Sequence, residues 1–401
     1  MTATHLGAAR REFRQGWTTV LGSALAVGVG MTGIGFYSLG LFVQPLQSEF
    51  GWSRAEVSGA ATAEQFGIFL SAPLVGRLAD RVGVRPIAIA SYIATPLAML
   101  LLAQTGPSVA AWYALWLLAS LAGCGTTPAI WARVVSSRFE DGRGLALGLM
   151  LVGTGLAAII APAMLGPVIA VHGWRSGVFT MAAIIFGLGL PASLLTARSN
   201  PRDEAVPGSA DRGRFEANRA TLILVAGALL LGAFVAGLII HLVPMLIDAG
   251  TQPVRATKVA ASVGIAVLGA RVIVGYLFDR FHAPYVACLF LMSPIASALL
   301  LRFGGPVVPA ALLLGFAAGA EVDMLAYFTS RYVHFLNYGA TYGVILGLFS
   351  LGAACGPLLF GFARDVTGNY DTILLVSAAA LILVVGLIAA LGPYRVEPEL
   401  A

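Results

Sequence analysis

The feature that most constrains this chain is a series of long apolar runs, separated by short breaks that are charged or rich in proline and glycine. A helix needs about 20 mostly apolar residues to cross a bilayer. Only 11% of the 401 residues are charged, whereas soluble domains carry about 25%. Because so few charges could not cover a water-facing surface, we predict an all-α integral membrane protein.

Dividing the chain at its breaks predicts twelve transmembrane helices. The first run follows the basic sequence RREFR and resembles a signal peptide. It is far longer than a signal core of roughly 7–15 residues, so we interpret it as an uncleaved helix. The predicted helices lie near 18–46, 55–78, 85–104, 109–136, 144–170, 176–196, 220–247, 255–278, 284–302, 307–332, 340–363 and 371–392.

A repeat and a polar stretch divide these helices into two groups of six. GRLADR at 76–81 and GYLFDR at 275–280 are 199 residues apart, and so are GLMLVG at 148–153 and GLFSLG at 347–352. Two segments that keep one offset indicate duplication, and a substrate site is expected near the bilayer midplane between such repeats. We predict an N-terminal six-helix bundle, a flexible cytoplasmic linker and a C-terminal six-helix bundle, at 1–197, 198–219 and 220–401.

The basic residues predict the orientation and exclude several functions. Seventeen arginines fall in the segments that a cytoplasmic N-terminus places inside, and six basic residues fall outside. Positive charge collects on the cytoplasmic side, so we expect both termini in the cytoplasm. The net charge of +5 then reflects topology and predicts no nucleic-acid binding. The sequence has no phosphate-binding loop and no metal-spaced His/Cys cluster, so we expect no enzyme activity, metal or cofactor. We also expect a monomer.

One motif carries a resemblance that covers nearly the whole chain. GRLADRVGVRP, which starts at residue 76, resembles the signature that the major facilitator superfamily carries between its second and third helices. The resemblance implies a secondary transporter that works by alternating access. Asp80 and Arg81 of this motif can pair across helix ends, and the second half repeats them as Asp279 and Arg280. We expect these four residues to gate the conformational change.

A second motif narrows the resemblance to one branch. Residues 139–153, F-x-x-x-R-x-L-A-x-G-x-x-x-x-G, are similar to the fifth-helix signature of the monocarboxylate transporters, a branch that also holds the oxalate/formate exchangers. HLVPMLIDAG and GAEVDMLAYFTSRY look like its bacterial members, which implies a bacterial inner membrane. Arg271 falls where the branch places the carboxylate-binding arginine of its eighth helix.

Arg271 also stands out on physical grounds. It lies inside the apolar run VAASVGIAVLGARVIVGYLF, where an unpaired guanidinium costs several kcal/mol and therefore needs a partner or a function. It precedes Asp279 by eight residues, which is about 12 Å along a helix and close to the midplane. A guanidinium is well shaped to bind a carboxylate. The alternative is a structural arginine that bridges helices.

Two departures from the branch shape the substrate prediction. Animal members carry a lysine near Tyr37 and an aspartate near Val267, and this chain has neither. The predicted eleventh helix also has no lysine, whereas oxalate exchange uses a second cation there. We therefore expect a monoanion rather than a dianion, with a proton route that differs from the animal one.

Several polar and aromatic residues are candidates to complete the site. Glu321 and Asp323 share the depth of Arg271, and their spacing points them about 200° apart, so one is expected to face the cavity and the other to pack against a helix. His241 is a proton carrier, an anion contact or a packing residue. The proton-coupling candidates are Asp323, Glu321, His241 and Glu64. The candidate substrate-contacting aromatics, each alternatively a packing residue, are Tyr37, Tyr327 and Phe328.

The sequence thus predicts a secondary transporter that moves a small organic monocarboxylate across a cell membrane. Arg271 is expected to bind the carboxylate, and a proton is expected to travel with it. Two alternatives stay open: an anion exchanger without proton coupling, and a membrane receptor that binds but does not transport.

Overall fold

A computed structural model describes residues 3–197 and 213–392 of the chain. Within these residues every regular element is a helix. The first part contains α1 (Ala3–Val29), η1 (Met31–Gly35), α2 (Phe36–Ser38), η2 (Leu39–Phe42), α3 (Val43–Phe50), α4 (Arg54–Val82), α5 (Val84–Leu102), α6 (Val109–Ala122), η3 (Cys124–Thr126), α7 (Pro128–Ser136), α8 (Arg143–His172), α9 (Trp174–Ile184), η4 (Ile185–Gly189) and α10 (Leu190–Thr196). The second contains α12 (Arg219–Asp248), α13 (Pro253–Arg280), α14 (Ala283–Arg302), α15 (Val307–Tyr332), η5 (Phe335–Asn337), α16 (Tyr338–Thr367) and α17 (Asp371–Ala389).

These elements form twelve membrane-crossing segments in the predicted ranges. Among the described residues, nine helices are long and apolar enough to cross a membrane, and the pair α1 and η1–α3, bent by 45°, makes a tenth. The other two are α4, which carries several charged residues, and α6–α7, which is interrupted between residues 123 and 127. The interruption begins at Gly123 and ends where Pro128 starts α7. A proline fits the first turn of a helix because no hydrogen-bond partner awaits its nitrogen there.

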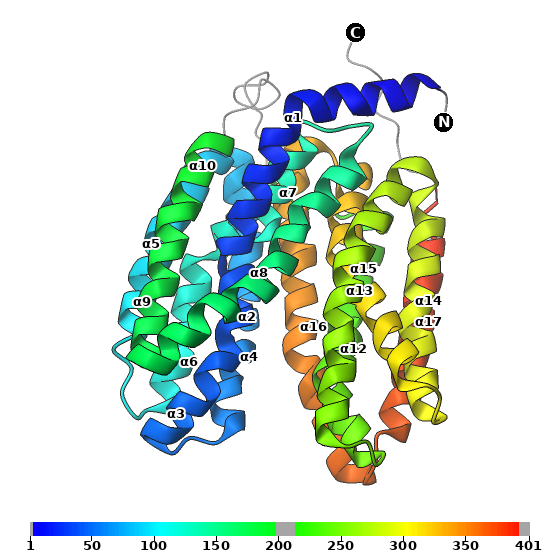
Figure 1. The fold of residues 1–401 in the computed structure, drawn as a ribbon. Helices are drawn as coiled ribbons and strands as arrows, with labels where there is room; N and C mark the ends of the chain where they lie inside the picture. Colours follow the sequence, from blue (N-terminus) through cyan, green and yellow to red (C-terminus); the bar gives the residue numbers. More distant parts are fainter. Residues whose placement is uncertain (1–2, 198–212, 393–401) are drawn as a thin grey trace.

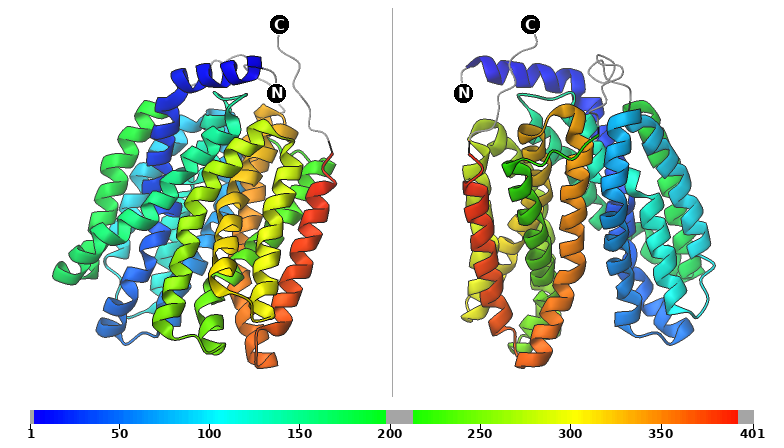
Figure 2. Two further views of the ribbon diagram at one scale, coloured as in Figure 1. Left: turned by 45° about the vertical axis from the view of Figure 1, so that its right-hand side comes forward. Right: turned by 180° about the vertical axis from the view of Figure 1, so that it is seen from behind.

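The two sets of helices lie side by side (Figure 1 and Figure 2). α1 to α10 form the first half, α12 to α17 form the second, and the halves meet where α4 packs on α16 and α8 on α13. The start of α1 and the end of α17 lie at the same end of the molecule (Figure 1). We call this the linker end, marked by Val82 and Tyr338, and the opposite one the far end, marked by Asp248 and Thr367. The predicted domain boundary falls partly in 198–212, outside the described residues, so the two-domain division stays a prediction.

Glycines allow the halves to touch backbone to backbone near the linker end. A Cβ atom on Gly76 would lie 1.9 Å from the carbonyl oxygen of Gly339, and one on Gly144 would lie 2.4 Å from the carbonyl oxygen of Gly275. A real Cβ would force these helices apart. The repeated glycines of the sequence motifs therefore set how closely the halves approach.

Candidate functional site

Arg271 forms an ion pair with Asp323 that joins α13 to α15. Its Nη1 donates to Asp323 Oδ1 at 2.8 Å, and the two residues are only 6% and 2% exposed. Gly319 brings the helices together one turn before Asp323, since a Cβ there would lie 2.5 Å from the carbonyl oxygen of Val267. The structure therefore gives the isolated arginine of the sequence an acidic partner.

The pair is incompletely satisfied. Arg271 Nε and Asp323 Oδ2 are both buried and have no hydrogen-bond partner. A buried polar atom left without a partner costs about 1–3 kcal/mol. The pair thus leaves one donor and one acceptor available for a further group.

α8 of the other half borders the ion pair. A Cβ on Gly148 would lie 2.4 Å from the carbonyl oxygen of Arg271 and 3.6 Å from Asp323 Oδ2. The pair therefore lies at the boundary between the two halves, beside the glycine of the fifth-helix motif. A change in how the halves pack would alter its surroundings.

Tyr342 of α16 belongs to the same region, and the sequence reasoning missed it. Its side chain is fully buried, and its hydroxyl has no hydrogen-bond partner. It interacts electrostatically with both Arg271 and Asp323. The only sequence signal was a tyrosine placed directly before the glycines of YGVILG.

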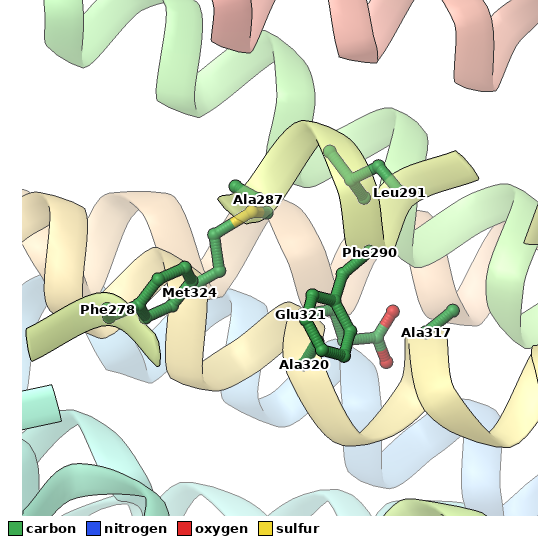
Figure 3. A pocket seen from close by; sticks show the side chains of 8 residues that line it. All are labelled: Phe278, Ala287, Phe290, Leu291, Ala317, Ala320, Glu321 and Met324. Atoms are coloured by element: carbon green, nitrogen blue, oxygen red, sulfur yellow. The ribbon is translucent and has the colours of Figure 1, made fainter. Parts of the chain in front are cut away.

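Glu321 lies on a different side of α15 and makes no ion pair with Arg271. Figure 3 shows its carboxylate at a small cavity between α13, α14 and α15, beside Phe290 and Ala317. The cavity measures about 10 Å³, which is room for about one water molecule. Of the two neighbouring acids, the structure therefore places Asp323, and not Glu321, against Arg271.

The other two proton-coupling candidates lie apart from the pair. Glu64 is fully buried in α4, and neither of its carboxylate oxygens has a partner. His241 uses both ring nitrogens, which lie 3.0 Å from the hydroxyl of Tyr370 and 3.0 Å from the carbonyl oxygen of Pro357. Its ring also stacks on Phe360. These contacts hold α12, α16 and the start of α17 together, so they account for His241 as a packing residue.

The three candidate aromatics take packing positions. The hydroxyl of Tyr327 donates to the carbonyl oxygen of Phe278 at 3.0 Å, and its ring lies 5.0 Å from the ring of Phe278. Phe328 is fully buried against the same ring. Tyr37 is partly buried and meets Phe36 edge-on. None of the three makes a hydrogen bond to Arg271 or Asp323.

Two motif aspartates cap helices of the opposite half at the linker end. Asp80 of α4 accepts hydrogen bonds from the backbone N–H groups of Gly339 and Ala340 at the start of α16, at 2.9 and 2.6 Å. A carboxylate is favourable there because the first N–H groups of a helix lack partners within the helix. Asp80 also forms a buried ion pair with Arg133 of α7.

Asp279 repeats this arrangement from the second half. Its carboxylate accepts from the backbone N–H groups of Gly144 and Leu145 at the start of α8, at 2.6 and 2.8 Å. Arg81 and Arg280 are instead exposed, and Arg280 donates to the hydroxyl of Tyr276. Adjacent helical residues point about 100° apart, so each motif aspartate faces the other half while its arginine faces outward. We call the two aspartates and the helix starts that they cap the linker-end gate.

Part of the predicted linker is ordered against this gate. Arg77 Nε of α4 donates to the carbonyl oxygen of Gly213 at 2.8 Å, and the N–H of Gly213 donates to the carbonyl oxygen of Leu336 at 3.2 Å. Gly213 has a φ of +69°, which favours glycine. Residues 213–218 therefore bridge both halves, while 198–212 lie outside the described residues.

These features define a multi-pass membrane protein in which two six-helix groups enclose a buried ion pair. The family model of the Major Facilitator Superfamily matches residues 25–357. The chain belongs to this superfamily of transporters, which confirms the resemblance drawn from the GRLADR motif. Among the described residues, no group of three His, Cys, Asp or Glu side chains could hold a metal ion.

The curated relatives include monocarboxylate transporters. Human monocarboxylate transporter 11 is 26% identical over 386 residues, which cover 92% of this chain and 81% of that protein. Bovine monocarboxylate transporter 13 is 28% identical over 383 residues, with 92% and 87% covered. The similarity to the monocarboxylate transporters expected from the fifth-helix motif is therefore present along nearly the whole chain.

Solved structures share the fold. FucP, a Major Facilitator Superfamily transporter in the outward conformation, has a TM-score of 0.74 at 16% identity and covers 94% of this chain and 98% of its own. The human organic anion transporter MFSD10 has a TM-score of 0.66 at 18% identity, with 94% and 99% covered. These likenesses confirm the predicted twelve-helix fold of two six-helix repeats.

Proposed function

We propose that this protein is a proton-coupled transporter of a small organic monocarboxylate and that Arg271 binds the carboxylate. The observation that carries the proposal is the buried Arg271–Asp323 pair, which keeps a cation at the boundary between the halves with its Nε free. The similarity to monocarboxylate transporters supports the same substrate class. A single cation beside a neutral tyrosine suits a monoanion better than a dianion.

Charge balance gives the reason for a proton. The empty pair is neutral, because the charges of Arg271 and Asp323 cancel. A bound carboxylate brings the buried site to a net charge of −1, and an uncompensated buried charge is costly. One proton taken up with the substrate restores neutrality. Asp323 is its expected carrier, since Oδ2 is a free acceptor and, of the four candidates, Asp323 is the one that forms an ion pair with Arg271.

Alternating access would follow from the linker-end gate. The gate is made of hydrogen bonds that backbone N–H groups at helix starts donate to Asp80 and Asp279, and water can replace such bonds when the halves separate. Opening the gate and closing the far end would move the boundary between the halves past the bound substrate. We further propose that the protein lies in a bacterial inner membrane as a monomer, with the linker end in the cytoplasm.

Transport by purified protein in proteoliposomes tests the proposal. Labelled formate, acetate, lactate and pyruvate are offered with and without an inward proton gradient. Arg271→Gln should reduce uptake to background. Arg271→Lys keeps the charge but loses the planar donor set; since a charge-assisted hydrogen bond contributes about 1.5–3 kcal/mol, substrate binding should weaken about tenfold or more. Arg302→Gln is the matched control, because that arginine lies at the far end beside Asp371.

The same assay separates the alternatives. Uptake that ignores the proton gradient but requires the acid on the opposite side would favour an anion exchanger. Binding without movement of any acid would favour a receptor. Normal binding and transport by correctly folded Arg271→Gln would leave the arginine as a structural bridge and refute its proposed role.

A further inference from the structure

Among the described residues, Tyr342 differs from the other fully buried tyrosines in what its hydroxyl contacts. The hydroxyls of Tyr92, Tyr327 and Tyr338 each donate to a backbone carbonyl oxygen, at 2.7, 3.0 and 3.4 Å. The hydroxyl of Tyr342 is equally buried and has no partner. A phenylalanine would fill the same space without burying an unpaired hydroxyl, so packing alone does not explain the tyrosine.

Its position is the boundary between the halves. Gly343, the next residue of α16, packs on α4, where a Cβ would lie 2.3 Å from the carbonyl oxygen of Ala72. Gly148 of α8 makes the corresponding close approach to Arg271 and Asp323. Tyr342 interacts electrostatically with both members of that pair. Arg271 Nε on α13, Asp323 Oδ2 on α15 and the Tyr342 hydroxyl on α16 are thus all buried, and none of the three has a hydrogen-bond partner.

The needs of a carboxylate match this set of atoms. A carboxylate has two oxygens, and each accepts hydrogen bonds. Because Asp323 engages Nη1 of Arg271, the Nε edge is left to donate to the carboxylate of a bound acid. Each carboxylate oxygen can accept more than one hydrogen bond, so there is room for a further donor. A neutral hydroxyl supplies that donor without adding charge, and a proton on Asp323 Oδ2 would satisfy the third atom.

We propose that Tyr342 is a substrate-positioning residue whose hydroxyl donates a hydrogen bond to the carboxylate held by Arg271. This inference rests on the proposed function, because it assigns a second contact to the same bound acid. It also explains why the empty protein tolerates an unpaired hydroxyl, since the substrate is its partner. Tyr342 therefore fixes the direction in which the acid points from the arginine.

The proposal predicts opposite effects on stability and on binding. Tyr342→Phe removes only the hydroxyl, so the thermal midpoint of the empty protein should stay the same or rise. The KM for the best-carried acid among formate, acetate, lactate and pyruvate should rise roughly tenfold, as expected for the loss of one hydrogen bond to a charged group. The maximal rate at saturating acid should change much less, because the residue positions the substrate and does not gate.

Tyr338→Phe is the matched control. Tyr338 lies one turn away in α16, its ring is 5.5 Å from that of Tyr342, and its hydroxyl already has a protein partner. Its loss should lower stability slightly and leave KM unchanged. An unchanged KM in Tyr342→Phe, or equal KM shifts in the two variants, would overturn the positioning role.

The two proposals fail in different ways. If Arg271→Gln still binds and carries the acid, the proposed function itself is wrong. If Arg271→Gln is inactive but Tyr342→Phe keeps its KM, the arginine site stands and only the role of Tyr342 falls. A drop in the thermal midpoint of Tyr342→Phe, with KM unchanged, would identify the tyrosine as a packing residue.

Discussion

The two ends of the molecule are held together in different ways. At the linker end, polar contacts join one half to the other: Asp80 and Asp279 cap helices of the opposite half, and Arg143 Nη1 donates to the carbonyl oxygen of Ser330 at 3.0 Å. At the far end the polar contacts stay within a half, as in the ion pairs of Glu49 with Arg175 and of Asp248 with Arg364. Among the described residues, no hydrogen bond or ion pair joins the halves there.

This difference indicates which end is closed. The linker end is fastened by several bonds between the halves, and the ion pair of Arg271 and Asp323 lies just inside them. The far end has no such fastening in the described part of the chain. We infer that the structure represents a state closed at the linker end, and that a substrate reaches Arg271 from the far end.

The nature of the bonds also matters for movement. Hydrogen bonds that backbone N–H groups donate to a carboxylate can be exchanged for bonds to water, so the proposed opening of the gate would leave no group unpaired. Glycine contacts such as Gly76 on Gly339 add close packing without interlocking side chains. These contacts are compatible with the proposed separation of the halves at the linker end.

The largest predicted effect is at Asp80. Asp80→Asn places an NH₂ group against backbone donors and breaks the buried ion pair with Arg133; breaking such a pair costs about 3–5 kcal/mol. Asp279→Asn loses the same kind of caps without that ion pair, at about 1.5–3 kcal/mol. Hydrogen exchange should therefore accelerate more at residues 335–343 in the first variant than at 140–147 in the second. Equal effects would show that Arg133 adds nothing to the gate.

A smaller effect is expected from adding a methyl group between the halves. In Gly275→Ala the Cβ would lie 2.4 Å from the carbonyl oxygen of Gly144, whereas Gly269 of the same helix has nothing within 4 Å. Gly275→Ala should push α13 from α8 and favour opening at the linker end. Gly269→Ala should stabilise the helix by roughly 0.5–1 kcal/mol and leave the gate unchanged.

Thermal unfolding in detergent and hydrogen exchange at the linker end measure both variants. If Gly275→Ala behaves like Gly269→Ala, the close approach of the two backbones does not hold the gate. If Gly269→Ala also speeds exchange at the linker end, the effect belongs to α13 as a whole and not to its contact with α8.

Much of the fold could be predicted because a helix that crosses a membrane must be a long apolar run, which is visible in the sequence. The predicted helix at 220–247 is α12, Arg219–Asp248, almost residue for residue. The break between α6 and α7 was missed because 109–136 is mostly apolar, although GCGTTP within it carries glycines, threonines and a proline. The ends and types of helices thus followed from apolar runs, and the interruptions depended on local backbone chemistry.

The offset of the repeat and the positions of the two capped helix starts differ by one helical turn. Its offset of 199 residues equates Gly144 with Gly343, but the residue that Asp80 caps is Gly339. α16 starts at Tyr338, one turn earlier than the repeat implies, because the start of a helix depends on its own cap. The offset between the repeats reflects their duplication, whereas the residue at which each helix starts depends on its local capping contacts.

The candidate site was partly accessible from sequence for a similar reason. Depth along a helix follows from residue counting, which is why Arg271 and Asp323 could be placed at one level. Whether the Tyr342 hydroxyl has a partner depends on how several helices pack together, and the spacing of residues in the sequence does not predict it. The same holds for Tyr327, whose hydroxyl bonds the carbonyl oxygen of Phe278 instead of facing the pair.

The smallest predicted effect is at the far end. It tests whether contacts at that end contribute to the contacts between the halves at the linker end. Glu49 accepts from Arg175 and from the indole of Trp174, both in its own half, and the ion pair is 39% and 41% exposed. Exposed pairs of this kind contribute about 0–1 kcal/mol. Glu49→Gln should therefore lower stability by no more than that. Because no contact between the halves is lost, hydrogen exchange at residues 335–343 should match the unmodified protein, in contrast to Asp80→Asn. Faster exchange there in Glu49→Gln would mean that contacts at the far end also stabilise the closed linker end. The two ends would then be energetically coupled.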